Sequence, residues 1–137
     1  MDDPKHTEIR QWLVKARHDV ESAKVLAAHP HSLRDTAVYH CQQAAEKALK
    51  AYLTWADSPF QKIHDLTTLL AQCSRHDAAF SQHQDACEIL TPYATLFRYP
   101  GEVMEPDASD VAEAIQLTTQ ILDFVEARFP SDVAGSV

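Results

Sequence analysis

The sequence predicts an all-α fold, an up-and-down bundle of about five helices, four of them long and one short. Apolar residues recur with a helical period along most of the chain. Alanine, leucine, glutamine and glutamate dominate, and these residues favour helices. The chain has only two glycines, both outside the periodic stretches, which argues against an all-β fold. With 137 residues we expect one domain over 1–137, with a core at about 8–129 and loose ends.

The strongest helical pattern runs from Ala37 to Trp55, and the rest of the chain is organised around it. No glycine or proline interrupts this stretch. Its apolar residues lie at the i, i+3, i+4, i+7 spacing of one helical face: Val38, Cys41, Ala45, Ala48, Leu49, Tyr52 and Leu53. We therefore expect a helix at about 35–56. Its small side chains should let a neighbouring helix approach closely.

A first helix precedes it, at about 8–28. Thr7 is the expected N-cap, and residues 1–6 are expected to be frayed. Pro30 prevents the helix from continuing. Because the link to the next helix is short, the two helices should pack antiparallel.

The middle of the chain predicts a third helix at about 66–76 and a fourth at about 79–98. Asp65 is the expected N-cap of the third helix. Pro92 lies inside the fourth, where it removes a backbone hydrogen bond. We therefore expect a bend or a break near Leu90.

The last helix should begin after Asp107, a good N-cap, and continue to Phe129. Its apolar residues repeat almost as heptads. Pro130 ends it, and the tail to Val137 should be loose.

Charge and cysteine content limit the possible functions. The net charge is −8, and an acidic surface opposes general nucleic-acid binding, although it permits a local basic site. The three cysteines have no CxxC spacing, which indicates buried thiols in a reducing cytoplasm. No apolar run has the length of a membrane span and no signal core opens the chain, so we expect a cytoplasmic protein.

No cofactor or metal site is predicted. His83 and Cys87 lie one helical turn apart, but zinc needs about four ligands and no cluster supplies them. The chain also lacks a glycine loop of the kind that cradles phosphates.

Three motifs carry a resemblance to a known family. The stretch from Tyr39 to Ala51, YHCQQAAEKALKA, resembles the second-helix signature of HEPN domains, which are small helical bundles. The run from His64 to Leu70 resembles the HDLxxLL entry to the third helix of that family. Arg98-Tyr99-Pro100 resembles the RYP that ends the fourth helix in one branch. The resemblance covers roughly residues 8–129.

The resemblance implies a specific chemistry. Many HEPN domains are metal-independent ribonucleases with an arginine, a short spacer and a histidine. The histidine can move protons on the attacking hydroxyl or the leaving oxygen, and the arginine can hold the phosphate. No histidine follows Arg98 at that spacing. The bare pattern does occur from Arg34 to His40, at the start of the second helix, where a histidine is better explained by packing or by a dimer contact.

Four residues are candidate ligand contacts, and each has a structural alternative. Arg98 can bind a phosphate, or it can interact favourably with the dipole at the C-terminus of the preceding helix. Tyr99 can contact a ligand or pack. Lys47 can contact a nucleotide or lie on a solvated polar side of its helix. His64 can bind a ligand or hydrogen-bond beside the cap of the third helix.

That polar side of the second helix is made of Gln43, Glu46, Lys47 and Lys50. Glu46 and Lys50 form an i, i+4 pair.

Three functions are compatible with these observations. By resemblance, the protein is an accessory HEPN module that binds nucleotide or a partner, forms a homodimer and acts beside a minimal nucleotidyltransferase in a toxin–antitoxin-like pair. Alternatively, it is an endoribonuclease toxin that uses Arg98, or Arg34 with His40, on RNA. The third possibility is a plain dimeric scaffold without a small ligand.

Overall fold

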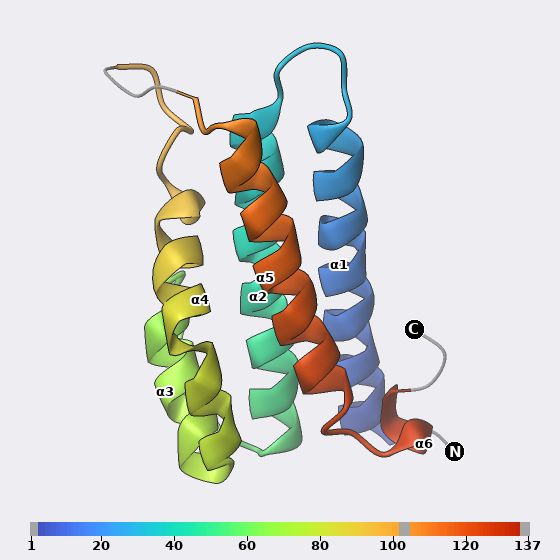
Figure 1. The fold of residues 1–137 in the computed structure, drawn as a ribbon. Helices are drawn as coiled ribbons and strands as arrows, with labels where there is room; N and C mark the ends of the chain where they lie inside the picture. Colours follow the sequence, from blue (N-terminus) through green and yellow to red (C-terminus); the bar gives the residue numbers. More distant parts are fainter. Residues whose placement is uncertain (1–2, 102–104, 135–137) are drawn as a thin grey trace.

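The computed structural model describes residues 3–101 and 105–134, and these residues form an α-helical bundle without strands (Figure 1). This confirms the predicted fold class. The helices are α1 (Pro4–Ala27), α2 (Arg34–Trp55), α3 (Leu66–His76), α4 (Gln84–Leu90), α5 (Ala108–Glu126) and α6 (Ser131–Ala134). Two 3₁₀ helices flank α4: η1 (Ala78–His83) and η2 (Thr91–Ala94). None of the described helices combines the length and the apolar run that a bilayer crossing requires.

Helix α2 is the centre of the bundle. It packs against α1, α5 and α3, and α4 in turn packs against α3 (Figure 1). Helices α1 and α2 are antiparallel and joined by residues 28–33, as predicted. Fully buried alanines line α2: Ala37, Ala44, Ala45, Ala48 and Ala51. Their short side chains allow close helix approach. The buried hydroxyl of Thr118 on α5 also donates to the Cys41 carbonyl on α2, at 2.8 Å.

Helix α1 begins earlier than predicted. Asp3 is its N-cap, and the carboxylate accepts a hydrogen bond from the Lys5 amide at 2.9 Å. Pro4 takes the first helical position, where its fixed φ suits the helix and its missing N–H has no cost. The predicted cap at Thr7 is therefore wrong. The predicted fraying is also wrong for residues 3–6. The first two residues lie outside the described part of the chain.

The caps of α3 and α5 are confirmed. The Asp65 carboxylate accepts from the Thr67 amide at 3.0 Å, and α3 has the predicted bounds. Asp107 and Asp110 form a capping box on α5, in which each carboxylate accepts from the backbone amide of the other residue. Helix α5 ends at Glu126, slightly before the predicted end.

The predicted fourth helix is broken into three short segments. The expected break near Leu90 is confirmed, because α4 ends there and the 3₁₀ turn η2 carries Pro92. The Thr91 hydroxyl secures the break, since it donates to the Cys87 carbonyl at 2.7 Å and accepts from the Leu66 amide at 3.2 Å. Regular structure ends at Ala94, so the predicted continuation to residue 98 is wrong.

The tail is not loose where it is described. Residues 131–134 form α6, and the Val133 side chain is buried against the core, as is Phe129. The prediction of a loose tail is therefore wrong for α6, because Val133 has apolar surface to bury. Residues 135–137 lie outside the described part.

The cysteines are buried thiols, as predicted. Cys41, Cys73 and Cys87 are all inaccessible to solvent and free of disulfides. Burial raises the pKa of each thiol to about 12, because a thiolate would lose its hydration. These cysteines therefore fill the core and are not reactive groups.

The predicted solvated side of α2 is largely buried. The side chains of Glu46 and Lys50 are only 7% and 8% exposed, and Oε2 and Nζ lie 3.0 Å apart. The other Glu46 oxygen, Oε1, lies 2.9 Å from His64 Nδ1 and accepts from Gln42 Nε2 at 3.2 Å. The segment before α3 covers this side of α2, a tertiary contact that helical periodicity does not contain. The i, i+4 pair is confirmed, but its solvation is not.

Aromatic rings complete the enclosure of Lys50. Its ammonium lies 5.8 Å from the ring centre of Trp12 and 5.6 Å from that of Phe60. Such cation–π contacts stabilise a cation that has lost its water. The buried charge pair is therefore paired, hydrogen-bonded and surrounded by rings, the condition under which buried charges are tolerated.

Replacing Glu46 by glutamine should flatten the dependence of stability on acid pH. Burial acts to raise the pKa of Glu46, but hydrogen bonds from His64, Lys50 and Gln42 outweigh it and leave the pKa below its ordinary value of 4.5. A carboxylate with a lowered pKa contributes stability that is complete above 4.5 and is lost as the pH falls through its folded-state value. Glu46→Gln should lack this loss and be less stable at neutral pH by about 1–3 kcal/mol, since Lys50 keeps only a neutral partner.

Urea unfolding followed by circular dichroism, from neutral to acid pH, measures both effects. Glu113→Gln is the matched control, because Glu113 is exposed on α5 and its removal should leave the pH profile of the wild type. Identical profiles for Glu46→Gln and the wild type would contradict the assignment.

Candidate functional site

Arg98 and His40 line one hollow, although they are far apart in the sequence. The hollow has a volume of about 310 Å³, and Asp35, Thr36 and Tyr39 complete its lining. It lies beside the first turns of α2, where the chain from η2 passes. Arg98 and His40 were predicted as candidates in separate places, and the fold brings them together.

Arg98 is held by an aromatic contact. Its guanidinium carbon lies 4.1 Å from the ring centre of Tyr39, which places the cation against the ring. Arg98 lies beyond the end of η2. Its guanidinium contacts Tyr39 on α2. Its amide donates to the Thr95 carbonyl at 3.3 Å, within a turn.

The residue before Arg98 adopts an unusual backbone conformation. Phe97 has φ 70°, in the left-handed region that bulky residues avoid. Its half-buried ring packs against the core and stacks on Tyr93, with ring centres 6.2 Å apart. Such strain persists only where the surroundings enforce it, and it often marks functional sites. Here the turn directs the chain so that Arg98 reaches Tyr39.

His40 is oriented by a buried carboxylate on α1. Its Nδ1 lies 2.8 Å from Asp19 Oδ1, and the Asp19 side chain is only 10% exposed. The second oxygen, Oδ2, accepts from Lys47 Nζ at 2.5 Å. A carboxylate on one ring nitrogen fixes the ring and keeps the other nitrogen, Nε2, for a further partner. His40 itself is 28% exposed, so solvent and ligands can reach it.

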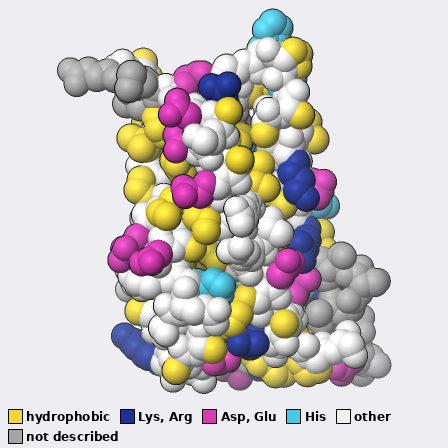
Figure 2. Space-filling view, viewed as in Figure 1, with side chains coloured by type: hydrophobic (Ala, Val, Ile, Leu, Met, Phe, Trp, Pro, Cys, Tyr) yellow, Lys and Arg dark blue, Asp and Glu magenta, His cyan; other side chains and the backbone are white. Residues whose placement is uncertain are grey.

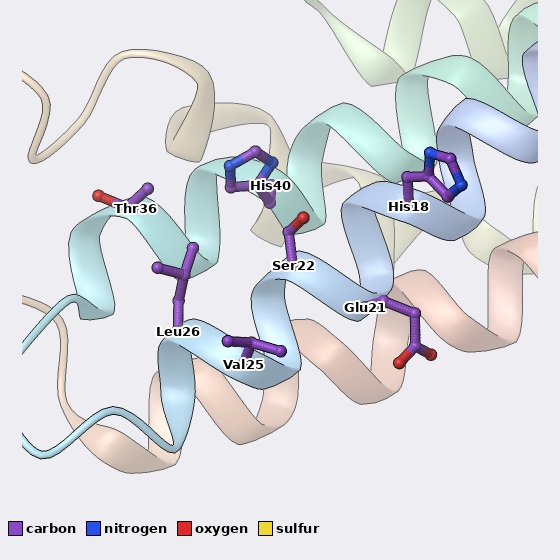
Figure 3. Close-up of a pocket in the computed structure, with 7 residues that line it drawn as sticks. All are labelled: His18, Glu21, Ser22, Val25, Leu26, Thr36 and His40. Carbon is purple, nitrogen blue, oxygen red and sulfur yellow. The ribbon is translucent and has the colours of Figure 1, made fainter.

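A second, larger hollow adjoins the first. It lies between the C-terminal half of α1 and the first turns of α2 and has a volume of about 620 Å³ (Figure 3). Its lining consists of His18, Glu21, Ser22, Val25, Leu26, Thr36 and His40. Thr36 and His40 belong to both hollows. In Figure 3, Ser22 and Leu26 point from α1 toward α2, whereas Glu21 extends away from it.

The charge of the protein limits what it can bind. On the described residues of the face in Figure 2, which is the α5 side of the bundle, lysine and arginine side chains are scattered singly among acidic ones. This agrees with the net charge of −8. A long polyanion usually needs a continuous basic surface, so an acidic protein would have to recognise an anion through a few placed cations.

The other predicted site residues lie elsewhere or have structural partners. Arg34 opens α2 and lines neither hollow of His40. Lys47 donates a hydrogen bond to Asp19. His64 contacts Glu46 through Nδ1, and the His64 side chain is 65% exposed. Tyr99 is 67% exposed and does not line the hollow of Arg98. The described residues contain no group of three or more histidine, cysteine and carboxylate side chains that could hold a metal ion.

Asp19 and Tyr39 belong to the site but were not among the predicted site residues. A signal for Asp19 was present, because it falls among the buried positions of α1, beside Ala16, Val20 and Ala23. An aspartate on an apolar helical face indicates a buried carboxylate with a partner. No signal in the sequence linked Tyr39 to Arg98, since that contact arises from the turn at Phe97.

Comparisons with known proteins agree with the fold. Residues 9–128 match the model of the HEPN domain family. The structure resembles TT1696 from Thermus thermophilus, which is 27% identical in sequence, with a TM-score of 0.74 over 88% of this chain and 98% of that chain. It also resembles ST0689, an archaeal HEPN homologue, with 23% identity and a TM-score of 0.70 over 88% of this chain and 96% of that one. No curated protein matches the sequence.

Replacing Asp19 by asparagine should destabilise the protein. Asparagine keeps the shape but removes the charge that Lys47 and His40 share, so the free energy of unfolding should fall by about 1–3 kcal/mol. Chemical denaturation measures this change. Glu21→Gln on the exposed side of the same helix is the control and should stay within about 0.5 kcal/mol of the wild type. Equal stability of Asp19→Asn and wild type would show that the buried carboxylate does not organise α1 against α2.

Proposed function

Because the chain belongs to the HEPN family, we propose that it binds the phosphate group of a nucleotide in the hollow lined by Arg98 and His40. One observation carries the proposal: the guanidinium of Arg98 lies over the ring of Tyr39, 4.1 Å from its centre, in the hollow that His40 also lines. A guanidinium held there can direct its forked N–H donors at phosphate oxygens.

The start of α2 adds to the attraction. The N-terminus of a helix carries partial positive charge and unpaired amides, both of which favour anions. The N-cap position is occupied by Leu33, whose side chain cannot accept a hydrogen bond from these amides. Asp35 also lines the hollow, where its carboxylate opposes an anion and already accepts from the Thr36 amide at 2.8 Å, so Arg98 has to supply most of the attraction for a phosphate. The arginine is therefore the residue on which binding should depend.

In this proposal the protein is an accessory module rather than a free-standing catalyst. It forms a homodimer and acts beside a minimal nucleotidyltransferase, encoded nearby or fused, in a toxin–antitoxin-like pair. What supports this role is the resemblance of the second-helix signature, the HDL run and the RYP run to HEPN domains of that kind. The RYP-type branch itself stays a prediction.

Removing the Arg98 side chain should weaken nucleotide binding at least tenfold. The test is calorimetric titration of the wild type and of Arg98→Ala with AMP, GMP, CMP and UMP. Arg98→Lys should fall between them, because lysine keeps the charge but loses the forked geometry.

Arg75→Ala is the matched control, since Arg75 is an exposed arginine in the last turn of α3. It should bind like the wild type. If the wild type binds none of the four nucleotides, or if Arg98→Ala binds them equally well, the proposal is wrong.

A second function, metal-independent RNA cleavage, is favoured by the pairing of Asp19 with His40. A histidine held at Nδ1 by a carboxylate can take the proton of a ribose 2′-hydroxyl at Nε2. The 2′-oxygen then attacks the phosphorus to form a 2′,3′-cyclic phosphate, the bond to the 5′-oxygen breaks, and that oxygen takes a proton from water. Arg98 would stabilise the charge on the phosphate during this step.

Cleavage of a mixed single-stranded RNA in EDTA tests this second function. The wild type should cleave, and both His40→Ala and Arg98→Ala should lose cleavage while they stay folded by circular dichroism. His29→Ala changes an exposed histidine in the loop after α1 and should keep full activity. An inactive wild type at high protein concentration would leave only the binding function.

A further inference from the structure

The larger hollow extends the phosphate site in one direction. His40 and Thr36 line both hollows, so a ligand that lies against Arg98 can continue past His40 into the space between α1 and α2. Arg98 lines only the smaller hollow. A phosphate therefore belongs at one end of this joined site, and the rest of the ligand belongs at the other.

The chemistry of the larger hollow differs from that of the smaller one. Val25 and Leu26 give it an apolar wall, and Val25 is 67% exposed, which is unusually open for a valine. Ser22 and Thr36 contribute hydroxyl groups, His18 contributes an imidazole ring, and Glu21 contributes a carboxylate. An apolar wall with a few polar groups around it is typical of small-molecule sites, and a nucleobase, with apolar faces and a polar edge, matches this combination.

The sizes agree with this division. The larger hollow holds about 620 Å³ and the smaller about 310 Å³. A nucleoside is larger and less polar than its phosphate, so the larger, more apolar space suits the nucleoside.

We propose that the groove lined by Ser22, Val25, Leu26 and Thr36 is the subsite for the base of the nucleotide whose phosphate lies against Arg98. The inference rests on the proposed phosphate site for the orientation of the ligand. The contact of the base with the groove is a separate property of α1 and α2. Affinity should therefore contain two contributions that can be removed independently.

The first experiment compares AMP with ribose 5-phosphate, which lacks the base, by titration of the wild type. AMP should bind at least tenfold more tightly. Val25→Gln should reduce this preference to less than threefold without changing the affinity for ribose 5-phosphate. Val14→Gln is the matched control, because Val14 is another partly exposed valine on α1 but lines neither hollow of the joined site. Arg98→Ala should weaken both ligands by the same factor.

The second experiment titrates the protein with adenosine, guanosine, cytidine and uridine, which lack a phosphate. Binding is measured by NMR, as changes in the chemical shifts of the backbone amides. At millimolar concentration at least one nucleoside should shift the amides of Ser22, Val25 and Thr36, and Val25→Gln should abolish these shifts. If the nucleosides shift them but no phosphate compound depends on Arg98, the base subsite stands and the phosphate site is wrong.

Two results would overturn the base subsite. One is equal affinity of the wild type for AMP and ribose 5-phosphate, which would leave the phosphate site intact. The other is the absence of nucleoside shifts together with a loss of dimer in Val25→Gln by light scattering, which would assign the groove to a second copy of the chain.

Discussion

Helix α2 is packed on several sides, and this constraint governs the rest of the structure. Because α1, α5 and α3 all contact it, the polar side chains that α2 carries inward have to find partners within the protein. Glu46 and Lys50 satisfy each other, with His64 and Gln42 on the remaining carboxylate oxygen. A second polar cluster lies closer to the loop at residues 28–33. There the Asp19 carboxylate on α1 pairs with His40 and Lys47 on α2.

That second cluster shows how a structural contact can prepare a functional one. Asp19 is buried between α1 and α2, so its carboxylate needs the hydrogen bonds of His40 and Lys47. The same bond that stabilises the helix pair fixes the ring of His40 at the edge of two hollows. The geometry of the site is therefore maintained by the stability of the helix pair, and a ligand does not have to organise it.

The helices were largely predictable, because apolar periodicity and capping residues are local properties. The bounds of α3 and the caps at Asp65 and Asp107 depend only on nearby residues. The burial of Glu46 and the meeting of Arg98 with His40 were not predictable, since both depend on which segments cover α2. The start of α1 is different, because Asp3 followed by Pro4 is a local cap signal, and the prediction placed the cap at Thr7 instead.

The connection between α4 and α5 explains why Arg98 matters more than its exposed position suggests. In its described residues this connection touches the α1–α2 end of the bundle through Arg98 on Tyr39 and through Glu105, which accepts from the Ser32 hydroxyl. The left-handed backbone at Phe97 costs about 1–3 kcal/mol, and the packing of its ring against the core offsets that cost. A ligand bound to both Arg98 and the start of α2 would add a further contact between this connection and α2. Its binding energy would favour the conformation in which the turn at Phe97 places Arg98 against Tyr39.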